Sequence, residues 1–277
     1  MAVLPGAYNS SRLMHERFVF LSGIVYFLFA CSATALDMDA ERAETLANYI
    51  ELDVPDGKGP HPLAVLMPGC LGWHAHHTKW REELGELGYA TLYIDSFSAN
   101  GLKGRAILER KVCSGQRVPG AERAADLIAV LGNTWDRADI LAEQTVLFGW
   151  SHGGWTALEF LSAISSDAQA LEIETTNLRA AFLYYPYCGI GLSAAIDLPV
   201  HTETIIFHGK NDAITNPREC RVLAENLSTA GADIKFVPLQ YAGHWFDNHA
   251  VRSVYNANAT TRARTLVNQK LDSIETE

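Results

Sequence analysis

Basic residues are scarce in this sequence of 277 residues. Lys and Arg together number 22 against 32 Asp and Glu, which gives a formal net charge of -10 at pH 7. Binding to a phosphate backbone needs a concentrated basic face, and the sequence contains no such cluster. We therefore expect no nucleic-acid partner.

The sequence also lacks an apolar run long enough to anchor it in a membrane. The stretch Phe18–Phe29 is shorter than the roughly 20 residues that a transmembrane helix needs. Arg12 and Arg17 precede it, and Ala33–Ala35 follows it with the small-x-small pattern of a signal peptidase site. We expect residues 1–35 to be a cleaved secretory signal peptide, and the mature protein to be secreted or periplasmic without a stable membrane span.

A second interpretation of the N-terminal segment stays open. Leu28-Phe29-Ala30-Cys31 resembles a lipoprotein signal, so lipid attachment at Cys31 is the alternative to signal-peptide cleavage. The sequence does not indicate an oligomeric state.

No internal repeat, low-complexity tract or interdomain linker divides the rest of the chain. Apolar residues make up 48% of the sequence, which is typical of one globular domain, here residues 40–277. Short runs rich in β-branched and aromatic residues predict strands at Leu63–Met67, Ala90–Ile94, Thr145–Gly149, Ala180–Tyr185, Thr204–Phe207 and Lys235–Leu239, with a weaker one near Tyr49–Val54. Amphipathic stretches predict helices at Lys79–Leu87, Gly120–Leu131, Gly153–Ser165, Pro217–Thr229 and about Val251–Ser273. This alternation predicts an α/β fold with a mostly parallel central sheet and helices on both faces.

The connection after the strand at Ala180–Tyr185 is too short for a large cap domain. Only 18 residues, Pro186–Glu203, separate it from the next strand. We therefore expect an open site and a preference for short, soluble substrates.

The segment Gly149-Trp150-Ser151-His152-Gly153 has the G-x-S-x-G pattern of a nucleophile elbow. It follows a predicted strand and precedes a predicted helix, which is the context that this motif requires. The turn exposes the serine hydroxyl, and the helix N-terminus behind it favours developing negative charge. Ser151 is therefore the candidate nucleophile.

A serine nucleophile needs a base, and the base needs an orienting acid. His244 follows the last predicted strand, and Asp212 follows the strand before it, so both are expected at the same sheet edge as Ser151. The chain order Ser, Asp, His is that of α/β hydrolases. His208 and His249, which is expected in the start of the closing helix, are alternative bases, and Asp247 is an alternative acid.

The turn Pro68-Gly69-Cys70-Leu71-Gly72 ends the strand expected beside the nucleophile strand. Its backbone can direct the N–H of Cys70 or Leu71 at an oxyanion, and the N–H of His152 can supply a second donor.

Three histidines lie close together in Trp73-His74-Ala75-His76-His77. Without carboxylate or cysteine ligands at a recognised spacing, they do not predict a metal site, and we interpret the segment as a mobile loop at the rim of the pocket. Apolar pocket walls are predicted from the aromatic residues near the motifs, namely Trp73, Trp150, Tyr185, Tyr187 and Trp245.

Together these motifs, with Asp95-Ser96-Phe97 and Tyr184-Tyr185-Pro186, resemble the dienelactone hydrolase family over roughly residues 60–250. The resemblance implies a small single-domain α/β hydrolase that acts on esters or lactones without a metal or an organic cofactor. The founding enzymes of the family use a cysteine nucleophile, where this sequence has Ser151. We find no match for the arginines with which those enzymes hold a substrate carboxylate.

Four cysteines remain after residues 1–35 are removed. In the strand order of α/β hydrolases, Cys70 and Cys113 follow neighbouring strands, as do Cys188 and Cys220. We expect the disulfides Cys70–Cys113 and Cys188–Cys220, which suit an oxidising compartment. Four free thiols are the alternative.

The sequence thus predicts a hydrolase that cleaves carboxylic esters or lactones through an acyl-serine intermediate, with a small molecule as substrate. An amide or peptide hydrolase with the same triad, and a non-catalytic binding protein on the same fold, remain alternatives.

Overall fold

The computed structural model describes residues 41–276, except 169, 170, 172 and 193–195. The expected signal peptide and Cys31 lie outside the described residues. Residues 42–277 group into one compact unit. Among the described residues, no helix combines the length and the apolar content that crossing a membrane requires.

The described residues contain one sheet of seven strands in the order β1-β3-β2-β4-β5-β6-β7. The strands are β1 (Ile50–Asp53), β2 (His61–Met67), β3 (Ala90–Ile94), β4 (Ile140–Trp150), β5 (Leu178–Tyr184), β6 (Glu203–Gly209) and β7 (Ile234–Leu239). β1 pairs antiparallel with β3, and every other neighbouring pair is parallel. The predicted mostly parallel sheet is confirmed.

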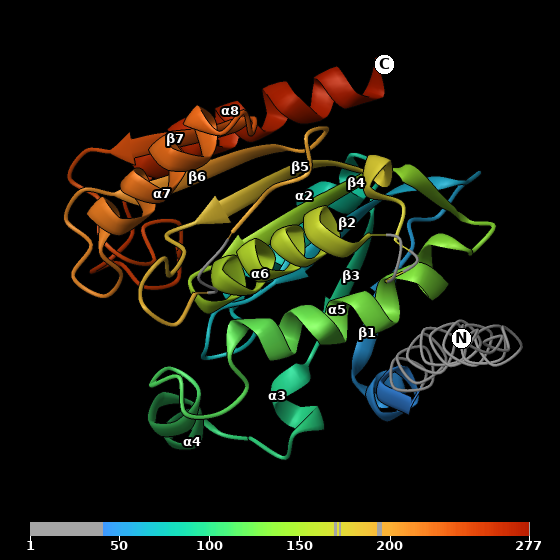
Figure 1. Ribbon diagram of the computed structural model, residues 1–277, viewed down its shortest axis with the longest axis horizontal. Helices are drawn as coiled ribbons and strands as arrows, with labels where there is room; N and C mark the ends of the chain where they lie inside the picture. The colour runs from blue at the N-terminus through green and yellow to red at the C-terminus, as the bar shows by residue number, and fades with distance from the viewer. Residues whose placement is uncertain (1–40, 169–170, 172, 193–195, 277) are drawn as a thin grey trace, which may run out of the picture. The chain divides into compact units, whose positions relative to one another are not determined.

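Five longer helices cover the sheet, and Figure 1 shows α5 and α6 lying side by side across it. The helices are α2 (Ala75–Glu86), α5 (Gly120–Trp135), α6 (His152–Asp167), α7 (Pro217–Thr229) and α8 (Ala257–Glu275). Short 3₁₀ turns occur at η1 (Ala47–Tyr49) and η2 (Thr175–Asn177).

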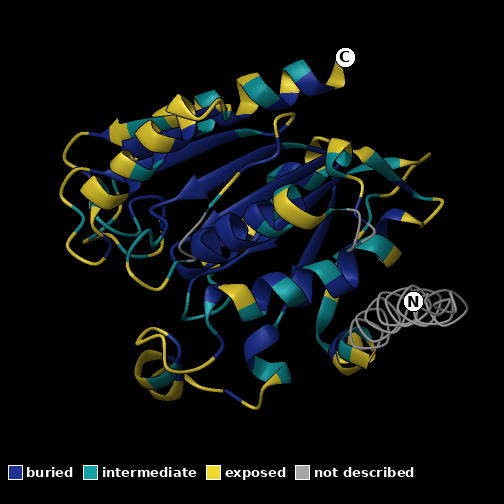
Figure 2. Cartoon of the chain, viewed as in Figure 1, coloured by how far each residue is buried: buried dark blue, intermediate teal, exposed yellow. Residues whose placement is uncertain are grey.

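Side chains of the central strands point alternately to the two faces of the sheet. In β2, Val65 and Met67 join the core under α5, α6 and α7, whereas Ala64 and Leu66 join the core under α2 and α8. Figure 2 shows the strands and the inward helix faces as buried and the outward helix faces as exposed. A strand buried on both faces has a continuous apolar sequence, which is why these strands were recognisable.

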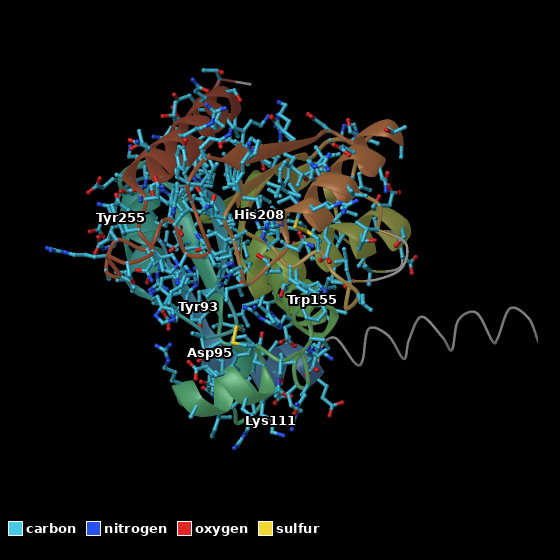
Figure 3. The ribbon with its side chains drawn as sticks, turned by 90° about the vertical axis from the view of Figure 1, so that its left-hand side faces the viewer. Tyr93, Asp95, Lys111, Trp155, His208 and Tyr255 are labelled. Atoms are coloured by element: carbon cyan, nitrogen blue, oxygen red, sulfur yellow. A yellow bond between two sulfur atoms is a disulfide. The ribbon has the colours of Figure 1, made fainter. Side chains whose placement is uncertain are left out.

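Two short helices, which the sequence patterns do not predict, lie in the described connection between β3 and α5. They are α3 (Ser96–Ala99) and α4 (Arg105–Lys111), and Figure 3 labels Asp95 and Lys111 near their ends. Phe97 of α3 and Leu108 of α4 join apolar side chains from the rest of this connection in a small separate core, against which Cys70 and Leu71 pack. The β3–α5 connection therefore supports the turn that follows β2.

The closing helix begins at Ala257, six residues later than predicted, because Asn256 caps it. The Asn256 side chain accepts a hydrogen bond from the Ala259 N–H at 3.0 Å. His249 consequently lies in the turn before the helix, not in its first turn. Among the described residues between β5 and β6 there is no helix, which agrees with the absence of a large cap.

Candidate active site

The carboxyl ends of the parallel strands meet at one edge of the sheet, and the candidate residues lie on the loops that leave this edge. Met67 of β2 is in register with Gly149 of β4, and Gly209 of β6 is in register with Leu239 of β7. Ligands of open α/β sheets bind at this edge.

Ser151 occupies a strained turn between β4 and α6. Its φ of 54° and ψ of -112° lie outside the regions that a side-chain-bearing residue prefers, at a cost of about 1–3 kcal/mol. A Cβ on Gly149 would lie 2.6 Å from the Gly153 carbonyl oxygen, and a Cβ on Gly153 would lie 1.7 Å from that of Met67. Both motif glycines are thus required by close backbone approach.

Ser151, His244 and Asp212 form one hydrogen-bonded chain. His244 Nε2 lies 3.0 Å from Ser151 Oγ, and His244 Nδ1 lies 2.8 Å from Asp212 Oδ2. A carboxylate can only accept here, so His244 Nδ1 donates and Nε2 is left to accept the serine proton. This is the geometry that activation of a hydroxyl by a general base requires.

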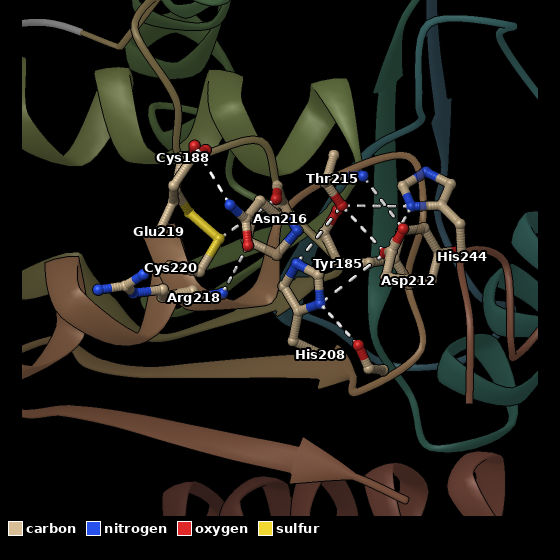
Figure 4. The surroundings of a disulfide bond; sticks show 12 residues. Tyr185, Cys188, His208, Asp212, Thr215, Asn216, Arg218, Glu219, Cys220 and His244 are labelled. Atoms are coloured by element: carbon tan, nitrogen blue, oxygen red, sulfur yellow. Dashed lines mark hydrogen bonds and ion pairs between the residues drawn. A yellow bond between two sulfur atoms is a disulfide. The ribbon is translucent and has the colours of Figure 1, made fainter. Parts of the chain in front are cut away.

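Asp212 is held by its own loop as well as by His244 (Figure 4). Its Oδ1 accepts the backbone N–H groups of Ile214 at 2.8 Å and Thr215 at 3.0 Å, and the Thr215 hydroxyl lies 3.0 Å from Oδ2. Burial alone would raise the pKa of Asp212, but the hydrogen bonds from His244 and the two amides outweigh it and lower the pKa. Asp212 is therefore ionised at neutral pH.

Thr215 was not singled out in the sequence, although its spacing carries a signal. An Asp followed three residues later by Thr is the pattern of a carboxylate that caps its own loop. The Thr215 hydroxyl also lies 3.3 Å from His244 Nδ1, so this side chain contacts both partners of the Asp212–His244 hydrogen bond.

The alternative acid and base take other partners in the structure. Asp247 accepts the Trp150 indole N–H at 2.9 Å and the Tyr185 hydroxyl at 2.7 Å. His208 Nδ1 lies 3.8 Å from Asp212 Oδ2, and burial lowers the pKa of this imidazole. The contacts of Asp247 and His208 therefore place both beside the Ser151–His244–Asp212 chain, not in it.

A buried arginine contacts the turn that is expected to form the oxyanion hole. Arg123 Nη1 donates to the Pro68 carbonyl at 2.9 Å and to His152 Nδ1 at 3.2 Å. Burial and the Arg123 charge lower the pKa of His152 to about 3, so this imidazole is neutral. Arg123 thereby links the Cys70–Leu71 turn to the first residue of α6, a role that no sequence pattern indicates for an arginine in an amphipathic helix.

Within the part of the chain that the structure describes, two neighbouring cavities both reach Ser151. The first, here the His244 pocket, measures about 330 Å³ and is lined by residues that include His74, His77, Trp150, His244, Trp245 and Val254. The second, here the Trp155 pocket, measures about 460 Å³ and is lined by residues that include Val112, His152, Trp155, Tyr187, Ile190 and Thr215. Both share Cys70, Cys113, Ser151 and Ile214.

Two of the predicted pocket walls do not line these cavities. Trp73 donates its indole N–H to Thr78 Oγ1 at 2.9 Å and packs under the Arg81 guanidinium. Tyr185 is fully buried, with its ring centroid 4.5 Å from that of His244. Tyr185 supports the histidine from behind because its backbone follows β5 directly.

The three histidines after Trp73 do not form the expected loop. His74 caps α2, and His76 and His77 lie buried in its first turn. The His74 backbone N–H donates to His77 Nδ1 at 2.8 Å, which closes the helix end. Among the described residues there is no group of three or more His, Cys, Asp or Glu that could hold a metal ion.

Both expected disulfides are present near the site. Cys70 is bonded to Cys113, and Cys188 is bonded to Cys220, as Figure 4 shows for the second pair. The first joins the turn after β2 to the β3–α5 connection. The second joins the loop after β5 to the start of α7.

Comparisons with known proteins bear on the family and the fold. A family model described as "Dienelactone hydrolase family" matches residues 51–274. No match is found among curated proteins.

Solved structures share the fold at low sequence identity. A candidate dienelactone hydrolase from Klebsiella pneumoniae is 17% identical, with a TM-score of 0.63, over 81% of this chain and 99% of that one. A dienelactone hydrolase-like promiscuous phosphotriesterase from metagenomic libraries is 17% identical, with a TM-score of 0.57, over 82% and 99%. Esterase 2 of Thermogutta terrifontis is 21% identical, with a TM-score of 0.59, over 81% and 89%.

Proposed function

Because the chain belongs to the dienelactone hydrolase family, we propose that it is a serine hydrolase that cleaves carboxylic esters or lactones of small, soluble substrates through an acyl-serine intermediate. The observation that carries the proposal is the hydrogen-bonded chain from Ser151 through His244 to Asp212. Family membership supports hydrolysis of ester-type substrates, and the side chains support the choice of nucleophile.

The first half of the reaction acylates Ser151. Ser151 Oγ attacks the carbonyl carbon of the ester while His244 Nε2 takes the hydroxyl proton, and Asp212 stabilises the imidazolium that forms. The tetrahedral oxyanion faces the backbone N–H groups of His152 and of Cys70 or Leu71. When the C–O bond to the alcohol breaks, His244 returns its proton to the leaving oxygen.

The second half releases the acid. His244 takes a proton from a water molecule, whose oxygen attacks the acyl carbon, and the collapse of the second tetrahedral intermediate restores the Ser151 hydroxyl. Every proton transfer therefore passes through His244 Nε2. The residues assigned to these steps need no metal and no organic cofactor.

We also propose that the protein works outside the cytoplasm, either secreted or periplasmic. The two disulfides support this location, because such bonds persist in oxidising compartments. Residues 1–35 are assigned as the export signal on the sequence pattern alone. Determining the N-terminal residue of the exported protein by mass spectrometry tests the assignment.

Hydrolysis of p-nitrophenyl esters with graded acyl chains tests the proposed activity. We expect turnover of short-chain esters by the native protein and no turnover by Ser151→Ala purified in the same way. Amidase activity without esterase activity would favour the amide-hydrolase alternative. Absence of any Ser151-dependent hydrolysis would favour the binding protein.

A further inference from the structure

The two pockets meet at Ser151, but only one of them is lined by the candidate base, His244. His244 lines the first pocket, whereas the second is lined by His152, Trp155 and Tyr187. The Cys70–Cys113 disulfide and Ile214 border both cavities. A substrate bound at Ser151 therefore has two distinct directions in which to extend.

We propose that the alcohol part of the ester binds in the His244 pocket and the acyl part in the Trp155 pocket, and that both parts are uncharged and apolar. The inference rests on the proposed esterase function and adds to it the class of substrate.

Proton transfer decides whether the alcohol part or the acyl part of the ester lies beside His244. The leaving oxygen must come within hydrogen-bond reach of His244 Nε2 to receive its proton. Nε2 lies 3.0 Å from Ser151 Oγ, so the leaving oxygen departs on the side of the nucleophile that His244 occupies. The alcohol attached to that oxygen then extends along His244 and Trp245 towards Val254.

The acyl group takes the opposite direction. It is the remaining carbon substituent of the carbonyl group, and it points away from the leaving oxygen. The cavity available there has a wall made by Trp155 and Tyr187, whose ring centroids lie 5.4 Å apart. The Trp155 indole N–H donates to Glu159 at 2.9 Å, and this hydrogen bond holds the Trp155 side of the wall.

The pocket linings favour uncharged groups. The described residues that line the two cavities include no Lys, Arg, Asp or Glu. Burial lowers the pKa of His74 and of His77, and burial beside Arg123 lowers that of His152 to about 3. A carboxylate or ammonium group placed in either pocket would thus be desolvated without an ionic partner, which is costly.

A matrix of esters with independently varied acyl and alcohol parts tests the assignment. Tyr187→Ala enlarges the Trp155 pocket, Val254→Ala enlarges the His244 pocket, and Val222→Ala changes an exposed apolar residue on α7 as the control. We expect Tyr187→Ala to shift kcat/KM towards longer acyl chains by about tenfold at constant alcohol. Val254→Ala should shift kcat/KM towards larger alcohols several-fold, with the acyl preference unchanged.

A matched pair of substrates tests the charge. Ethyl hexanoate and monoethyl adipate have six-carbon acyl parts that differ in a terminal carboxylate. We expect kcat/KM to be about 100-fold lower for monoethyl adipate, because the carboxylate would be buried without a partner.

The outcomes separate this inference from the proposed function. Ser151-dependent hydrolysis with the two selectivity shifts exchanged, or with equal rates for the two ethyl esters, overturns the pocket assignment and leaves the esterase intact. If no ester in the matrix is hydrolysed in a Ser151-dependent way, the esterase proposal fails and the pocket assignment fails with it.

Discussion

Trp150, the residue before the candidate nucleophile, donates its indole N–H to Asp247 over 2.9 Å. The other Asp247 oxygen accepts the hydroxyl of Tyr185, whose ring packs against His244. Both carboxylate oxygens thus accept hydrogen bonds from side chains that flank the Ser151–His244 pair. We therefore propose that Asp247 is a positioning residue and that Asp212 is the acid.

Replacing each carboxylate by an amide separates these two roles. Asp212→Asn should lower kcat by about 10⁴-fold, because an amide cannot stabilise the imidazolium and favours the wrong tautomer. Asp247→Asn should retain kcat within about tenfold and lower the melting temperature, since a buried hydrogen bond is lost. Steady-state kinetics with thermal melts measures both. A larger loss of kcat in Asp247→Asn than in Asp212→Asn would reverse the assignment.

The contacts of Arg123 predict a second positioning effect. Arg123→Met removes the donor that holds the Pro68 carbonyl and His152, so the expected oxyanion donors lose their alignment. We expect kcat to fall by about tenfold or more with KM nearly unchanged, because the oxyanion exists only in the transition state. Arg137→Met, which removes an exposed arginine, is the control. A change confined to KM would contradict the positioning role.

The Cys70–Cys113 disulfide should contribute to both stability and activity. It closes a separation of 43 residues, for which the chain-entropy model gives about 4 kcal/mol of stabilisation. We expect the double variant Cys70→Ser/Cys113→Ser to unfold at lower denaturant concentration and to lose activity, since Cys70 borders both pockets. The matched control is Cys188→Ser/Cys220→Ser, with a separation of 32 residues.

Peptide mapping without reduction checks the pairing itself. We expect peptides that link Cys70 to Cys113 and Cys188 to Cys220. Free thiols at all four positions, or a Cys70–Cys220 link, would refute the pairing.

The contribution of Asp212 to the free energy of unfolding should decrease as the pH falls. Its pKa in the folded protein is lowered from the ordinary value of 3.8, so its contribution is complete above that value and is lost as pH falls through the folded pKa. We expect the difference in unfolding free energy between the native protein and Asp212→Asn to shrink as pH falls below about 4. His208 and His244, which face this carboxylate, are present in both proteins. A difference that grows on acidification would contradict the lowered pKa.

Local sequence patterns were sufficient to predict the features that a single segment of the chain determines. Each buried strand has a continuous apolar run, and the elbow combines a strand, a turn and a helix within residues 145–165. The strand order then placed Cys70 near Cys113. These features depend on neighbours in the chain or on a topology shared by many folds.

Side-chain contacts between distant segments could not be predicted in this way. Arg123 reaches Pro68 and His152 only after α5 packs beside α6, and nothing in its helix distinguishes it from a solvated arginine. Tyr185 was expected in the pocket because it is aromatic, yet the Asp247 carboxylate, 62 residues away, holds its hydroxyl in the core. The direction of a side chain at a strand end is decided by such partners.

Reaction with a fluorophosphonate, read out by peptide mass spectrometry, is the most direct measurement of whether Ser151 is an activated nucleophile. The native protein should acquire one adduct on the peptide that contains Ser151, because His244 can remove the hydroxyl proton over 3.0 Å. Labelling should be absent in Ser151→Ala and strongly reduced in His244→Ala at equal protein concentration. An unlabelled native protein, or an adduct on another serine with Ser151 unmodified, would contradict the proposed mechanism.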